Sequence, residues 1–136
     1  MKKKIIIWAV VLLVLSFIFS LLFYRDLNPI KISAVNLAKE YSENKSQADQ
    51  KYLDNKIVVT GTVKAIYRLL GTRRVLEFNT GDSTFPVICF FMDEHEDFVA
   101  SQLQQDQNIE ITGKCVGEDA YSFVKGIKIE VSEIKE

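Results

Sequence analysis

An apolar run from Ile5 to Tyr24 follows three lysines at the start of the chain, and it constrains the fold more than any other feature. About twenty residues at roughly 1.5 Å each form a helix of about 30 Å, which matches the hydrocarbon core of a bilayer. Only Ser16 and Ser20 interrupt the run with polar side chains. The sequence therefore predicts a membrane-spanning helix over residues 5–24, within an N-terminal membrane anchor at residues 1–25.

A cleaved secretory signal is the alternative interpretation of this segment. Signal sequences have shorter apolar regions, of about 7–15 residues, and end in a small-x-small cleavage site. Here the run ends in Leu22-Phe23-Tyr24-Arg25, which contains no small residue. An uncleaved anchor is favoured. Because Lys2–Lys4 favour the cytoplasmic side, we expect a single-pass protein of the cell (inner) membrane, with a cytoplasmic N-terminus and an extracytoplasmic domain.

The remaining residues, 26–136, suffice for one domain with a hydrophobic core. Of the 17 basic residues, Lys2–Lys4 and Arg25 belong to the anchor, which leaves 13 against 18 acidic residues. A net charge of about −5 disfavours nucleic acid as a ligand, because phosphate contacts need basic side chains, although a local basic patch stays compatible with it. The chain has one histidine, His95, and no Cys/His cluster with ligand spacing, so we expect neither a metal nor a cofactor.

Two short helices are predicted after the anchor. Asn28-Pro29 is a turn signal, so residues 26–32 are expected to form a short tether. Apolar residues at helical spacing follow Ser33, whose hydroxyl is a natural N-cap. A second helix is expected to begin after Asn44 and to end near Tyr52.

Alternating residues then predict five strands. The first runs from Lys56 to about Arg68, with the alternate residues Ile57 to Tyr67 on one buried face and Gly61 allowing a sharp coil. The others are expected at residues 74–79, 85–92, 109–114 and 122–133, with Phe123 inward in the last. A loop is expected at 69–72, a turn at 80–83 and a helix at 93–103, between the third and fourth strands.

This order is typical of an OB-fold. We therefore predict an N-terminal transmembrane helix plus a small mainly-β domain at residues 33–136, a five-stranded OB-fold barrel with preceding helices and a helix between strands 3 and 4. An SH3-like barrel also has five strands, but it lacks a helix of this length at that position.

The stretch NKSQADQKYLDNKIVVTGTV carries a family resemblance. It has the residues Asn44, Ala48, Asp49, Lys51, Tyr52, Lys56, Val59, Gly61 and Val63 at matching positions, and the segments VICFF and ITGKCVG also match. In these features the chain resembles the tRNA-anti-like family of bacterial OB-fold proteins. The resemblance implies an OB fold and a membrane-anchored or exported protein. It brings no catalytic residues, so we expect no enzyme.

A ligand-binding face is predicted where OB-folds usually bind, around the loop between the first two strands and the loop between the last two. Exposed aromatic rings beside basic residues would suit a planar ligand. The alternative is an ordinary solvated surface, with the arginines offset by Glu118 and Asp119 in the opposing loop. The predicted residues are Thr60, Thr62, Lys64, Arg68, Arg73, Arg74, Phe90 and Tyr121.

Cys89 and Cys115 share the inward parity of their strands. Outside the cytoplasm they could form a disulfide across the barrel, and equally they could be two buried thiols. The run Asp93–Asp97 suggests a metal site, but consecutive helical residues diverge, so acidic residues at a helix N-terminus are the better interpretation.

Two functions are predicted. The first is a membrane-anchored extracytoplasmic module that binds an envelope protein or glycan partner. The alternative is an OB domain that binds single-stranded nucleic acid through the basic residues Arg68, Arg73 and Arg74.

Overall fold

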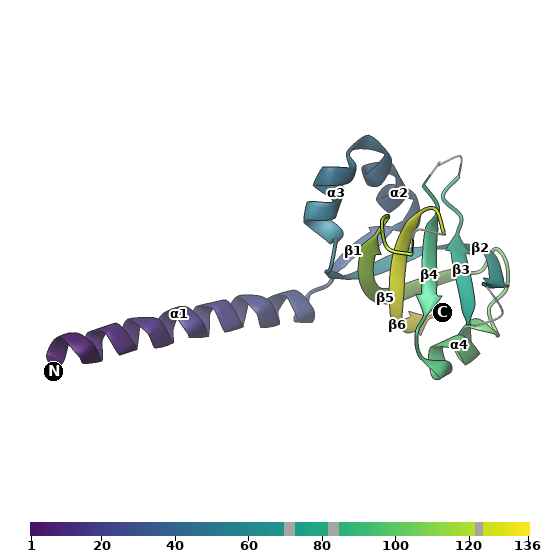
Figure 1. Cartoon of the computed structure of the whole chain (residues 1–136). Helices are drawn as coiled ribbons and strands as arrows, with labels where there is room; N and C mark the ends of the chain where they lie inside the picture. Colours follow the sequence, from purple (N-terminus) through teal and green to yellow (C-terminus); the bar gives the residue numbers. More distant parts are fainter. Residues whose placement is uncertain (70–72, 82–84, 122–123) are drawn as a thin grey trace.

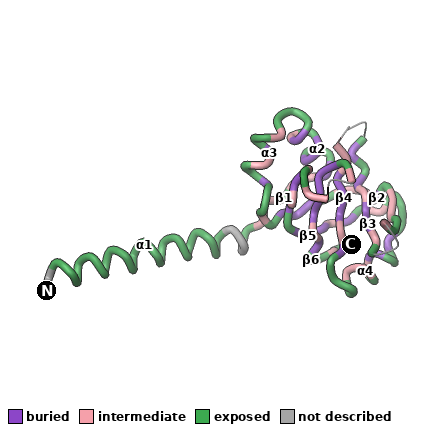
Figure 2. Tube along the Cα trace, viewed as in Figure 1, coloured by how far each residue is buried: buried purple, intermediate pink, exposed green. Residues whose placement is uncertain are grey.

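The N-terminal helix projects away from the rest of the molecule (Figure 1). The computed structural model describes residues 1–69, 73–81, 85–121 and 124–136. Helix α1 covers Lys2–Leu27, and the apolar part that could cross a membrane is Lys3–Tyr24, with a mean hydropathy of 3.0. Its described side chains are exposed along its whole length (Figure 2). The described residues of the barrel leave this apolar surface exposed. By length and composition, α1 fits a membrane-spanning helix or a signal sequence.

Strand β1 (Ile30–Ser33) corrects the predicted tether. It pairs in parallel with β2, from Ile30 opposite Ile57 to Ser33 opposite Thr60. The sequence predicts a tether over residues 26–32, but residues 26 and 27 continue α1, and residues 30–32 belong to the sheet. The alternation of Ile30 and Ile32 with polar neighbours was the available signal, although four residues are a short pattern.

Helices α2 (Ala34–Glu43) and α3 (Lys45–Tyr52) confirm the predicted caps. The Ser33 hydroxyl accepts a hydrogen bond from the Asn36 amide at 3.2 Å, and the Asn44 side chain accepts one from the Gln47 amide at 3.0 Å. Each cap satisfies a backbone donor that the first turn leaves free. The buried side of the two helices packs on the barrel through Ala34, Leu37, Ala38, Tyr41, Ala48 and Tyr52.

Five strands close into the OB-fold barrel. They are β2 (Lys56–Arg68), β3 (Arg74–Phe78), β4 (Val87–Phe91), β5 (Asn108–Gly117) and β6 (Ile127–Lys135). The strand order is β2-β3-β4-β6-β5, and the pairing of β2 with β5 closes the barrel. Helix α4 (Glu94–Ala100) lies between β4 and β5 in the chain, which is the feature that separates this fold from the SH3-like alternative. It is shorter than the predicted helix 93–103.

Strand β2 is long enough to pair with two neighbouring strands of the barrel. Its first half pairs with β5, from Lys56 opposite Lys114 to Thr62 opposite Asn108, and its second half pairs with β3. A Cβ on Gly61 would lie 2.9 Å from Phe78 Cδ1, so the coil at this point needs glycine. Residues 70–72, 82–84 and 122–123 lie outside the described residues, and with them most of the predicted loop 69–72, half of the predicted turn 80–83, and Phe123.

A β-bulge in β2 corrects the predicted inward face. The register shifts between Val63 and Ala65, and a shift of one residue exchanges the two faces of a strand. Val59 and Val63 are buried in the core as predicted, but beyond the bulge Ile66 packs on the core, and Tyr67 is 36% exposed. The bulge thus turns Tyr67 toward the outer surface of the barrel.

Candidate ligand-binding face

The register of the sheet aligns four residues from four strands in one row. Tyr67 pairs with Val75, Val75 with Phe90, and Phe90 with Glu130. Their neighbours Leu76, Cys89 and Ile129 lie in the core, so the row lies on the outward side of the sheet, although Val75 within it is itself buried. We call this row, together with Tyr121 from the β5–β6 loop, the aromatic face. It occupies the surface of the barrel where OB-folds bind oligonucleotides and oligosaccharides.

Phe90 and Tyr121 form the centre of the aromatic face. Their ring centroids are 4.8 Å apart with a tilt of 31°, and both side chains are half-buried. The Tyr121 hydroxyl donates a hydrogen bond to Glu130 at 2.9 Å, and this bond raises the pKa of Tyr121. The ring of Tyr121 is therefore held at one end by packing and at the other by a carboxylate, which gives a fixed apolar surface beside a hydrogen-bond acceptor.

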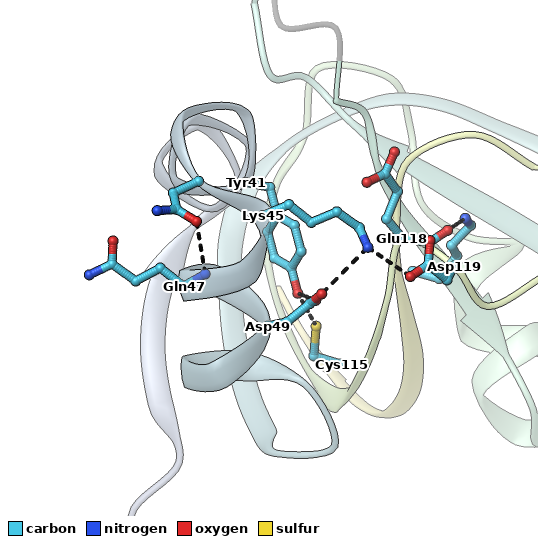
Figure 3. A network of polar contacts seen from close by, with 9 residues as sticks. Tyr41, Lys45, Gln47, Asp49, Cys115, Glu118 and Asp119 are labelled. Atoms are coloured by element: carbon cyan, nitrogen blue, oxygen red, sulfur yellow. Dashed lines mark hydrogen bonds and ion pairs between the residues drawn. The ribbon is translucent and has the colours of Figure 1, made fainter.

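The β5–β6 loop that carries Tyr121 is attached to the domain at two points (Figure 3). Lys128, which is 1% exposed, donates a hydrogen bond to the carbonyl oxygen of Glu118. Burial lowers the pKa of Lys128. Lys45 on α3 binds the carboxylate of Asp119 at 2.7 Å, and that bond lowers the pKa of Asp119. The loop is thus tied to both β6 and the helices.

A polar network continues from this attachment into the helices and becomes buried at Tyr41 and Cys115 (Figure 3). Lys45 lies 3.6 Å from Asp49, and the Tyr41 hydroxyl donates to Asp49 at 3.0 Å. The same hydroxyl lies 3.7 Å from the sulfur of Cys115. Burial of the Tyr41 side chain is the main cause that raises its pKa, and the nearby Cys115 raises it further. No local pattern in the sequence indicates the roles of Lys45, Lys128 and Glu130, because their partners lie outside the same helical turn or strand pattern, at separations of 74, 10 and 9 residues.

Two of the predicted cations have acidic partners inside the domain. The backbone amide of Arg74 donates to Asp97 Oδ1 at 2.7 Å, and the guanidinium Nη1 donates to Asp97 Oδ2 at 2.7 Å. Lys64 pairs with Glu77 across the strands at 2.7 Å. Arg74 therefore joins β3 to α4. Its acidic partner is Asp97, and not Glu118 or Asp119 of the opposing loop as predicted.

The other predicted residues fall into two places. Arg68 and Arg73 are exposed at the two ends of the β2–β3 loop. Thr60 and Thr62 lie on the first half of β2, opposite Glu110 and Asn108 of β5. The structure therefore brings Phe90 and Tyr121 into contact, whereas the two threonines belong to a different part of the barrel, where Thr60 lines a shallow depression with Ser33 and Lys135.

The family model for tRNA_anti-like proteins matches residues 1–126. The chain belongs to the tRNA-anti-like family. No curated protein matches its sequence.

Solved structures share the fold of this tRNA-anti-like protein at low identity. A lipoprotein from Klebsiella pneumoniae, whose name assigns it a provisional nucleic acid-binding role, is 15% identical over 77% of this chain and 92% of its own, with a TM-score of 0.57. An OBody bound to hen egg-white lysozyme is 20% identical over 62% of this chain and 78% of its own, with a TM-score of 0.51. The match to the asparaginyl-tRNA synthetase from Pyrococcus horikoshii covers 62% of this chain and 20% of the synthetase chain, at 14% identity and with a TM-score of 0.48.

The two cysteines of the tRNA-anti-like barrel are free buried thiols. Cys89 on β4 and Cys115 on β5 both pair with Ile129, so β6 lies between them. Two strand spacings separate their Cα atoms by roughly 9–10 Å, whereas a disulfide requires less than about 7 Å. Of the two alternatives that the sequence left open, the structure has the two buried thiols, and burial raises the pKa of both.

The acidic run at 93–97 builds the start of α4. The Asp93 carboxylate caps the helix by accepting from the His95 amide at 2.7 Å, and Asp97 binds Arg74. Among the residues that the structure describes, no group of three or more His, Cys, Asp or Glu side chains could hold a metal ion. The helix-start interpretation accounts for these residues.

Proposed function

We propose that this chain is a membrane-anchored, extracytoplasmic and non-enzymatic OB module that binds a glycan on its aromatic face. The observation that carries the proposal is the Phe90–Tyr121 pair, with the Glu130 carboxylate at its edge. The proposal also takes α1 as an uncleaved anchor, because its apolar side chains are exposed rather than packed on the described residues of the barrel.

The chemistry of the aromatic face suits a sugar. The C–H faces of sugar rings pack on aromatic side chains, and their hydroxyl groups donate to carboxylates. Phe90 and Tyr121 supply the rings, and Glu130 and Glu77 supply acceptors on the outer surface of β6 and β3. Tyr67, at the far end of the row, extends the apolar surface.

The charges around the aromatic face argue against a polyanion as the main ligand. Lys64 and Arg74 are both held by acidic side chains, and the domain carries a net negative charge. Binding of nucleic acid draws most of its free energy from basic side chains on phosphates. A ligand with hydroxyl groups and no net charge avoids that repulsion.

The test is a glycan array of neutral and N-acetylated oligosaccharides, probed with the full chain in detergent. We expect Tyr121→Ala to weaken binding about tenfold, because it removes a stacked ring and a hydrogen bond, together worth about 1.4 kcal/mol. The matched control is Phe98→Ala, which removes an exposed ring on α4. Binding that is indifferent to Tyr121→Ala would refute the proposal. A reproducible protein captured by cross-linking in cells, with no glycan bound, would point to the protein partner instead.

Single-stranded nucleic acid is a second candidate ligand, favoured by one observation. Arg68 and Arg73 are exposed at the β2–β3 loop, beside the strand ends that carry Tyr67 and Arg74. Anisotropy of labelled oligonucleotides with the full chain, across a salt series, tests this candidate. Affinity that falls with salt and with an Arg73→Gln substitution would support it. Affinity independent of salt would exclude it.

A further inference from the structure

The connection between the anchor and the barrel is very short. Helix α1 ends at Leu27 and β1 begins at Ile30, so only Asn28 and Pro29 lie between them. Two extended residues span about 7 Å. If α1 spans the membrane, as the proposed function assumes, the end of the barrel next to α1 lies at the headgroup layer, which is roughly 5–7 Å deep on each side of the hydrocarbon core.

A groove lies at this junction, between the end of α1 and the turn that joins α3 to β2. It has a volume of about 690 Å³, and its lining includes Leu22, Asn28, Lys51, Leu53, Asp54 and Lys56. Leu22 belongs to the apolar part of α1, Lys3–Tyr24. Because Leu22 lies near the end of this apolar part, a membrane-spanning α1 would place the groove where hydrocarbon gives way to headgroups.

The groove combines cations with an exposed apolar side chain. Lys56 is exposed and makes no ion pair with any residue in the described part of the chain. Lys51 pairs with Glu40 at 3.1 Å and keeps half of its side chain exposed, and Asp54 pairs with Lys114 at 3.6 Å. Leu53 is 39% exposed at the tip of the turn. In water an exposed leucine contributes no hydrophobic free energy, whereas at a bilayer interface it contacts acyl chains. Lysines at the same depth reach the lipid phosphates.

We propose that this groove is a docking site for the headgroup phosphates of anionic phospholipids, with Lys51 and Lys56 as the phosphate contacts and Leu53 as the interfacial contact. The site fixes the barrel on the membrane by its β1–β2 end. A lipid phosphate fits better than a free phosphate, because Leu22 and Leu53 supply apolar surface that a free anion does not use. The proposal rests on α1 as a membrane-spanning helix.

The experiment places the full chain in nanodiscs and labels residue 53 with a fluorophore after Leu53→Cys. Cys89 and Cys115 are retained, because both are buried. Lipids brominated in the upper acyl chain should quench the label at 53, whereas a label after Phe98→Cys should remain accessible to an aqueous quencher. Phe98 is the matched control because it is also an exposed apolar residue, on α4, which lies away from α1 (Figure 1). Equal aqueous quenching at 53 and 98 would overturn the proposal.

The role of the lysines is tested by lipid composition. A lysine near an anionic surface contributes about fivefold to the ratio of docked to undocked barrels, so Lys51→Gln with Lys56→Gln should lower it about 25-fold in phosphatidylglycerol nanodiscs. Lys125→Gln removes one charge from the β5–β6 loop and should change nothing. Docking that is equal in phosphatidylcholine and phosphatidylglycerol would overturn the assignment to anionic lipid. Displacement by millimolar glycerophosphate would assign the groove to a free phosphate.

Failure of the anchor is distinguishable from failure of the docking site. Extraction of the full chain from vesicles by alkaline carbonate would show that α1 does not span the membrane, and would overturn both the anchor and the docking site. Resistance to carbonate, combined with aqueous quenching at residue 53, would overturn the docking site alone. Glycan binding by the aromatic face is measured separately and depends on neither outcome.

Discussion

The buried thiol of Cys89 makes stability depend on pH in a calculable way. Cys89 lies in the core on β4 with no exposed surface, and burial raises the pKa of its thiol. In the unfolded chain a thiol ionises with a pKa of about 8.5. Above that pH the unfolded state loses a proton that the folded state keeps. The folded state is therefore fully stabilised below about pH 8.5 and loses stability as pH rises further.

The expected magnitude follows from the linkage relation. While only the unfolded state ionises, each thiol costs about 1.4 kcal/mol per pH unit. Between pH 8 and pH 10 the ionisation of Cys89 alone should lower the free energy of unfolding by about 2 kcal/mol. Cys115, whose pKa is also raised by burial, acts in the same direction. Lys128 acts in the opposite direction, because burial lowers its pKa and the folded state releases its proton first as pH rises toward 10.5.

The assay is urea unfolding of the full chain in detergent, followed by circular dichroism at a series of pH values from 8 to 10. Cys89→Ala should reduce the pH slope by about 1 kcal/mol per unit averaged over this range, because Cys115 and Lys128 contribute equally in both proteins. Val87→Ala is the matched control, since Val87 is equally buried on the same strand and does not titrate. It should lower stability without changing the slope.

An unchanged slope in Cys89→Ala would refute this reasoning. It would mean either that the thiol ionises inside the barrel or that Cys89 holds no free thiol, as in a disulfide with Cys115. A thiol count on the unfolded protein separates the two explanations, because a disulfide would leave neither cysteine reactive before reduction.

Two further predictions concern interactions that the fold creates. Arg74→Gln and Asp97→Asn should each destabilise the domain. A double-mutant cycle in urea should give a coupling free energy of about 1–2 kcal/mol, because the pair is largely buried and charge-assisted. A coupling near zero would show that α4 is held by its apolar contacts. Gly113→Ala should destabilise the domain by about 3 kcal/mol or more, because the alanine Cβ would lie 2.4 Å from the Glu130 carbonyl oxygen. The melting temperature of the variant, compared with that of the wild type, tests this prediction. An unchanged melting temperature would show that β5 and β6 can separate locally.

Local chemistry made much of the fold predictable. Ser33 and Asn44 cap their helices through backbone amides three residues away, so the signal lies within one turn. The strands β2 and β5 follow from alternation, because a strand with one buried face repeats every two residues. The order of these elements, with a helix between the third and fourth strands of the barrel, was enough to predict the OB-fold.

The candidate face was predictable only in part. Phe90 and Tyr121 were predicted from the strand and loop that OB-folds use, and the structure brings their rings together. Tyr67 was assigned to the buried side, because a bulge leaves no mark in an alternating pattern of apolar residues. Arg74 was assigned to the ligand, because nothing near it in the sequence indicated that Asp97, 23 residues away, would bind it.

The sequence by itself determined the apolar N-terminal helix, the helix caps, the period of the strands and the family, since each of these depends on residues close together in the chain. Only the tertiary structure decided which side chains, distant in the sequence, contact one another. Lys45 meets Asp119 across 74 residues, Cys89 and Cys115 are separated by β6, and the α3–β2 turn meets the end of α1. Pairing and barrel closure set these distances, and a linear pattern of residue types does not contain them.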